Sequence, residues 1–200
     1  MATFAELEQG VYEITVRTDL QTLTRQSLRA AIVAAHSLQD WERDLVQETF
    51  VDYIAPTLSS ESLQPNYQEF VLPERFRQAN RIIADMGDGV LIDKFVREQG
   101  QQLYLYGGSR EPFTYRVVGN NIRIGFVGAP DSLTLEYFSF PEIDTAAPST
   151  TSWIAASALH EYIVLHAAQR VLRSIGMPED ARALDNLLAE ARADLLANYS

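Results

Sequence analysis

Glycine and proline are distributed unevenly along the 200-residue chain, and this unevenness constrains the fold more than any other feature of the sequence. Eight of the ten glycines and seven of the eight prolines lie between Asp40 and Pro148. Both residues interrupt helices and mark turns, so this middle segment favours short strands and its flanks favour helices. The sequence predicts an α+β protein in which a four-helix bundle-like domain is interrupted by an antiparallel β insertion.

The predicted domain boundaries follow from the same contrast. We expect residues 1–40 and 149–200 to form one discontinuous helical domain, with two N-terminal and two C-terminal helices. Residues 41–148 then form the β-rich insertion.

Helical signals are clear at the N-terminal end. Thr3 and Glu6 have the spacing of a capping box, which predicts a first helix. Thr18 or Asp19 is expected to cap a second helix that ends near Ser37–Asp40. The predicted buried residues are Phe4, Leu7, Val11 and Ile14 in the first helix and Leu20, Leu28, Ala31, Ile32 and Ala35 in the second.

The C-terminal end carries similar signals. A third helix is predicted over Trp153–Ile175, with Thr151 or Ser152 as its cap and Gly176 as its stop. Its apolar residues surround it on most sides, which is typical of a central helix. Pro178 suits the first turn of a fourth helix. The expected buried stripe of that helix is Leu184, Leu187, Leu188, Ala191 and Leu195.

Within the insertion, the strongest signal is a hairpin in which Tyr115–Val118 and Ile122–Phe126 flank the turn residues Gly119–Asn121. Alternation over Leu133–Tyr137 predicts a third strand beside it in an antiparallel meander, with Leu103–Tyr106 as a further candidate. Other expected strands are Leu45–Ile54, Gln68–Leu72 and Arg81–Asp85. We expect single helical turns at Arg75–Asn80 and Asp93–Arg97, a loop over Pro56–Asn66 and an acidic turn at Asp85–Gly89.

Composition excludes several function classes. Sixteen basic and 27 acidic residues give a net charge of −11, which repels phosphates and argues against tight nucleic-acid binding. The charge is still compatible with a channel that nucleic acid passes through without binding. The absence of cysteine excludes disulfides, thiol catalysis and Cys-ligated zinc. With no apolar run of about 18 residues and no signal segment, we expect no membrane association and a cytoplasmic location.

No catalytic or metal-binding pattern emerges, so we expect neither an enzyme nor a cofactor. His160-Glu161 begins like a zinc-protease motif, but the next histidine is His166, on a different side of the helix. His36 has no second histidine near it in sequence. Asp85 and Asp88, close to Asp93, lack the ligand ladder of a calcium loop, although incidental cation binding stays open.

The aromatic residues leave two interpretations open. Trp153 suits either the core or a partner contact, with the core favoured. The many aromatic residues of the insertion could stack on bases, but the arginines among them are interspersed with acids, which favours packing.

Several strings, in this order, resemble the head-to-tail adaptor (connector, or head-completion) proteins of tailed bacteriophages. They are Val11–Leu20, Ala30–His36 leading into Trp41–Glu48, Leu72–Arg77 and Thr151–Ala155. The resemblance spans nearly the whole chain, and none of the strings is a catalytic signature.

The resemblance implies a structural virion protein: a ring of about twelve copies beneath the portal, joining capsid to tail. The helical part would line the DNA channel, with DNA nearby but not specifically bound, and the insertion would meet tail-tube, nozzle or further neck proteins. The protein would be located in the virion neck, and in the host cytoplasm during assembly. The C-terminal stretch Leu195–Ser200, with Leu195, Leu196 and Tyr199, would dock on the portal.

Two other readings stay open. One is a tail terminator or another neck component. The other is a cytoplasmic ligand-binding or regulatory α+β module.

Overall fold

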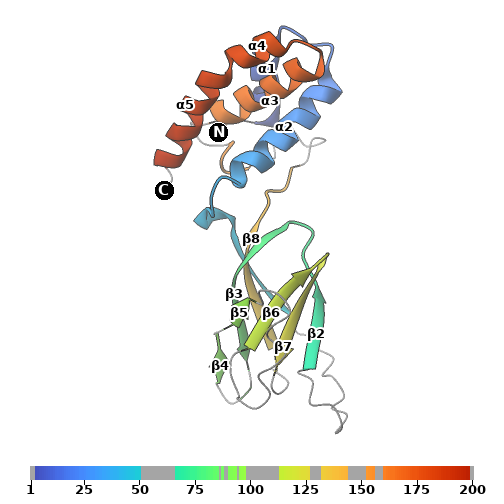
Figure 1. Ribbon diagram of the computed structural model, residues 1–200, viewed down its shortest axis with the longest axis vertical. Coiled ribbons are helices and arrows are strands. Elements are labelled where there is room, and N and C mark those ends of the chain that lie inside the picture. The colour runs from blue at the N-terminus through green and yellow to red at the C-terminus, as the bar shows by residue number, and fades with distance from the viewer. Residues whose placement is uncertain are drawn as a thin grey trace. The chain divides into compact units, whose positions relative to one another are not determined.

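The computed structural model describes residues 3–50, 66–85, 87, 90–93, 95–97, 113–126, 132–143, 152–155 and 160–198. The chain divides into two compact units, Met1–Asp44 with Phe140–Ser200, and Leu45–Ser139. Figure 1 shows helices at both ends of the colour scale and strands in its middle. The predicted mixture of helix and sheet is therefore confirmed. The helical unit has five α-helices among the described residues where four were expected, and their bundle-like arrangement stays a prediction.

The first helix, α1 (Phe4–Thr15), begins as the sequence predicts. The Thr3 hydroxyl accepts from the Glu6 backbone N–H at 3.2 Å, and the Glu6 carboxylate accepts from the Thr3 N–H at 2.6 Å. The helix ends at Val16, whose φ of +53° lies in the left-handed region. This conformation is energetically unfavourable for a β-branched residue, because its Cβ crowds the backbone.

The cap predicted for the second helix, α2 (Gln21–His36), is wrong. Its N-cap is Leu20, which provides no side-chain hydrogen bond. The Asp19 carboxylate instead accepts two hydrogen bonds from Arg17, each at 2.8 Å. Competition from the arginine removes the cap that Asp19 would otherwise supply. The predicted end is confirmed, because Ser37 is the C-cap.

A polar contact joins α1 to α2. Glu8 is buried, and its carboxylate accepts from Arg25 Nε at 2.9 Å and from the Tyr12 hydroxyl at 2.9 Å. Burial, with the Glu8 hydrogen bond and charge, raises the pKa of Tyr12 to about 12. The buried carboxylate is thus satisfied by donors from both helices.

The third helix, α3 (Glu161–Ser174), starts later than predicted. Trp153–Ala155 form a turn in which the Ser152 hydroxyl accepts from the Ala155 N–H at 3.2 Å, so the predicted start at Trp153 is wrong. Apolar residues continue through this turn, and apolar character alone does not mark where a helix begins. The predicted stop is confirmed: Gly176 has a φ of +79°, and Met177 N–H donates to the Leu172 carbonyl at 2.9 Å, as in a Schellman motif.

From Pro178 the chain forms two helices, where one was predicted. These are α4 (Pro178–Ala183) and α5 (Asp185–Asn198), separated at Leu184. Ala191 and Leu195 are buried, and Leu184 and Leu188 pack partly against the core. Leu187 is 48% exposed, which corrects the predicted stripe, because the break at Leu184 interrupts the continuous helix on which that stripe was based.

Helix α3 is central, as its apolar residues predict, and packs against α1, α2, α4 and α5. Helix α1 approaches it closely at Gly10, where an added Cβ would lie 3.2 Å from Val164 Cγ1. This close approach explains a glycine inside a helix, which is otherwise unfavourable.

The sheet unit consists of two four-stranded sheets. One has the order β1 (Leu45–Phe50), β8 (Ser132–Ser139), β3 (Phe76–Asp85), β4 (Leu91–Ile92). The other has the order β2 (Asn66–Val71), β7 (Asn121–Phe126), β6 (Phe113–Val118), β5 (Phe95–Arg97). Strands of both sheets supply one core: Phe70, Ile82, Ala84, Ile122, Leu133, Leu135 and Tyr137.

The predicted hairpin is confirmed as β6 and β7, which pair up to Val118 and Asn121. Gly119 has a φ of +60°, as a two-residue hairpin turn with glycine in its first position requires. The alternation of β8 is also confirmed, with Leu133, Leu135 and Tyr137 buried.

The meander is wrong, because β8 pairs with β1 and β3 and not with the hairpin. Alternation shows which face of a strand is buried but not which strand lies beside it.

Two predicted helical turns are also wrong. Residues 76–80 belong to β3, where register shifts between Phe76 and Gln78 and between Ala79 and Arg81 disguise the alternation. Phe95–Arg97 form β5, which pairs with β6 in parallel, whereas the other described pairs are antiparallel. The candidate strand 103–106 lies outside the described residues, as does the predicted loop apart from Asn66, which begins β2.

Candidate functional site

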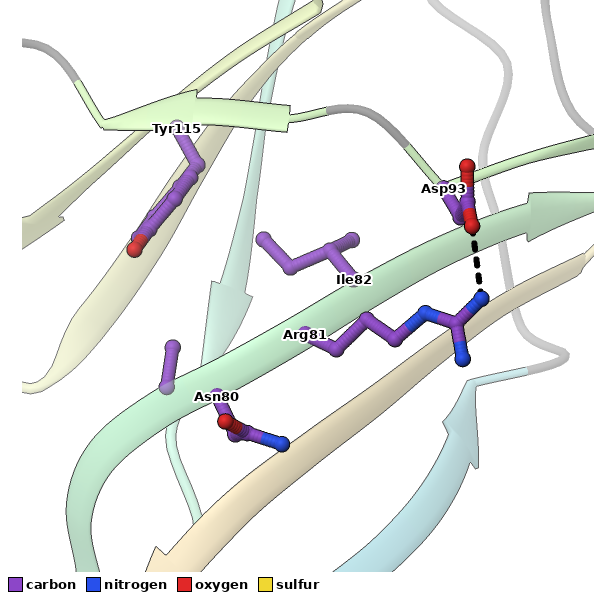
Figure 2. Close-up of a pocket in the computed structure, with 6 residues that line it drawn as sticks. Asn80, Arg81, Ile82, Asp93 and Tyr115 are labelled. Carbon is purple, nitrogen blue, oxygen red and sulfur yellow. Dashed lines mark hydrogen bonds and ion pairs between the residues drawn. The ribbon is translucent and has the colours of Figure 1, made fainter.

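We consider four places in the described residues as candidate sites, and the first is a pocket in the sheet unit. Figure 2 shows Tyr115 of β6 across this pocket from Asn80 and Ile82 of β3. Its volume is about 80 Å³, which suits water more than a metabolite. Arg81 Nη2 lies 2.6 Å from Asp93 Oδ2, and both side chains are half exposed. An exposed pair of this kind contributes little stability.

The acidic residues considered as cation ligands either contact other groups of the protein or lie outside the described residues. Asp93 pairs with Arg81, as above, and Asp85 Oδ1 accepts from the Gly87 N–H at 3.0 Å. Asp88 is outside the described residues. Among those that are described, no three histidine or acidic side chains gather as a metal centre would require.

The second place is an aromatic cluster in the helical unit, around Asp44. His36 and Asp44 are buried, and His36 Nδ1 lies 2.7 Å from Asp44 Oδ2. Trp153 Nε1 donates to Asp44 Oδ1 at 2.6 Å. Trp153 also packs edge-on against Trp41, with ring centroids 5.4 Å apart, and Arg43 lies over its ring. Asp44 therefore connects the end of the N-terminal segment of the helical unit, Met1–Asp44, to the turn that precedes α3.

The remaining histidines lie apart from this cluster. His160 is the exposed N-cap of α3. His166 is half-buried beside Tyr162, with ring centroids 5.7 Å apart. Burial lowers the pKa of His166, and the charges of Arg170 and Arg173 lower it further.

The third place is a groove between α2 and α3, with a volume of about 290 Å³. It is lined by Leu23, Gln26, Ser27, Arg170, Arg173 and Ser174. Two arginines beside an apolar side chain form a basic site on a strongly acidic chain. Such a site is suited to bind carboxylates.

The fourth place is the C-terminal end. Leu195 is fully buried in the core of the helical unit, and Leu196 packs partly against that core. Tyr199 lies outside the described residues. Docking of this stretch on a portal stays a prediction.

The profile of one protein family, described as SU10 adaptor protein, matches residues 3–199. The chain belongs to the SU10 adaptor protein family. This confirms the resemblance to phage head-to-tail adaptors and makes the chain a phage structural adaptor protein. No curated protein matches the sequence. None of the helices among the described residues has the length and apolarity to cross a membrane.

For this SU10 adaptor protein, sequence reasoning missed two features of the helical unit. It treated Asp44 as one acid among many, and it did not connect Arg170 and Arg173 with α2. The spacing of the two arginines on one helix, three residues apart, was a usable signal. The Asp44–Trp153 contact joins residues 109 positions apart and left no local pattern.

Proposed function

We propose that this adaptor protein forms a ring of about twelve copies beneath the portal, where it joins the capsid to the tail. The observation that carries this proposal is the family match, which extends through both units of the chain. In this proposal the helical unit builds the ring wall and lines the channel, and the sheet unit meets tail components.

The charge of the chain supports a role beside DNA without tight binding. A net charge of −11 gives little gain from counterion release and repels the phosphate backbone. A channel wall of this sign would let the genome slide past, as ejection requires.

The C-terminal stretch is the proposed contact with the portal. Because Leu195 is buried in the helical core, it would anchor this stretch, and Leu196 with the residues after it would meet the portal. Removing residues 196–200 should then weaken portal binding and leave the helical core folded.

The experiment that tests the proposal mixes the purified protein with the purified portal and observes the mixture by native mass spectrometry and negative-stain microscopy. Ring-on-ring complexes are the expected result. The proposal would be contradicted by a monomer that does not bind the portal. If a small molecule also raises the melting temperature of that monomer, the result favours a ligand-binding module. Absence of the protein from purified virus particles would contradict it as well.

A further inference from the structure

The groove between α2 and α3 carries positive charge that the monomer leaves largely uncompensated. Within the described residues the Arg170 guanidinium forms no ion pair, and Arg173 reaches Asp185 only at 3.6 Å, between half-exposed side chains. Leu23 supplies an apolar surface between the polar residues of the groove. The groove is therefore suited to a segment that combines an apolar side chain with carboxylates.

The outer surface of α5 has that combination. Leu187, Glu190 and Asp194 follow one another at spacings of three and four residues, so they share one side of the helix. Leu187 is 48% exposed, and the two acids are exposed. Within the described residues neither the Glu190 nor the Asp194 carboxylate forms an ion pair. Ala191 and Leu195 are the buried residues of this helix.

The two surfaces match in spacing as well as in charge. Arg170 and Arg173 are three residues apart on α3, and Glu190 and Asp194 are four apart on α5, so each pair spans about 5–6 Å between Cβ atoms. Two arginine–carboxylate pairs would then flank a contact between Leu187 and Leu23.

The two surfaces belong to different helices of the helical unit, the groove to α2 and α3 and its complement to α5. Figure 1 shows α2 and α5 flanking α3, and α3 packs against both. Among the described residues the groove arginines form no ion pair with Glu190 or Asp194 of their own copy, so this contact would join two copies. Repeated from copy to copy, such a contact is heterologous and closes into a ring when the rotation is right.

We propose that the α2–α3 groove of one copy binds the Leu187, Glu190 and Asp194 surface of a second copy of this chain. The inference rests on the proposed function, because it names the contact that closes the ring. DNA is the weaker candidate for the groove, since two arginines on a chain of net charge −11 neutralise too few phosphates to hold a duplex.

Paired charge reversals test the contact. One variant carries Arg170→Glu and Arg173→Glu, and the other carries Glu190→Arg and Asp194→Arg. All four side chains are exposed, so both variants should fold, which circular dichroism checks. Arg182→Glu, at an exposed position on α4, is the control for charge alone.

With the portal present, each double variant alone should lose ring formation, because its two surfaces repel, and the Arg182→Glu control should keep it. Mixed in equal amounts, the two variants should recover rings in which they alternate. Added salt should weaken the wild-type ring. Rings from either double variant alone, or no recovery in the mixture, would overturn the inference and leave the proposed function intact.

Two further outcomes are decisive. The wild type and the Arg170→Glu, Arg173→Glu variant are also compared for binding to a 30-base-pair duplex. If the variant assembles normally but loses a duplex binding that the wild type has, the groove binds DNA and the inference is wrong. If the wild type forms no ring on the portal, the proposed function fails. Sedimentation of the two variants without portal then decides the inference, which stands if the mixture associates and either variant alone does not.

Discussion

At the scale of single residues, Asp44 connects two segments of the helical unit that are far apart in the sequence. Its buried carboxylate meets His36 Nδ1 at 2.7 Å and accepts from Trp153 Nε1 at 2.6 Å, so its removal takes a charged partner from both rings. Asp44→Ala should lower the free energy of unfolding by about 2–4 kcal/mol. Glu42→Ala, at an exposed position in the same turn, should change it by less than about 0.5 kcal/mol. Urea denaturation measures both, and equal effects would show that the buried contact adds nothing.

His166 gives a prediction about pH. Its pKa is lowered in the folded protein from an ordinary value of 6.5, first by burial and then by Arg170 and Arg173. Between the two pKa values the unfolded chain binds the proton more readily. The stability that His166 contributes is therefore complete above about pH 6.5 and is lost as the pH falls toward the folded pKa.

An NMR titration of the His166 ring should give a lower pKa in the folded protein than in urea. Arg170→Gln with Arg173→Gln should raise the folded value only part of the way, because burial remains. A folded pKa at or above the unfolded one would show that the ring is solvated.

At the scale of elements, the contact between α1 and α3 depends on Gly10. A valine there would push its methyl groups into Val164, which lies 3.2 Å from the position of an added Cβ. We expect Gly10→Val to lower the free energy of unfolding by about 1–3 kcal/mol. Adding Val164→Ala should recover part of that loss.

Glu13→Val is the matched control, on the exposed side of α1. It should cost only the few tenths of a kcal/mol that helix propensity and a surface contact are worth. An equal loss at both positions, measured by thermal denaturation, would mean that the helices are not closely packed at Gly10.

The sequence predicted elements wherever a local signal was decisive. The Thr3–Glu6 spacing and Gly176 located helix ends, and Gly119 located the hairpin. It failed where a neighbouring side chain competes for a cap, and where distant strands complete a sheet. Arg17 takes the carboxylate that would cap α2, and β8 pairs with strands that alternation does not identify. At the candidate sites the failure was the same, because Asp44 and the α2–α3 groove exist only after distant segments meet.

At the scale of the whole molecule, each unit has its own hydrophobic core, and none of the described residues belongs to both. The helical unit should therefore fold without Leu45–Ser139 when a short Gly/Ser linker joins Asp44 to Phe140. We expect helical circular dichroism and one cooperative thermal transition. A product that only aggregates would show that the helices need the sheets.

The first and last strands of the sheet unit are neighbours, and Leu45 lies opposite Phe138 in their register. Antiparallel partners are about 5 Å apart, so the chain leaves and returns through almost the same point. The 95 residues from Leu45 to Ser139 therefore connect to the helical unit as a tight loop would, with their two ends close together. Any other domain with adjacent ends could be grafted there, which would replace the surface of this unit while the helical unit keeps its own core.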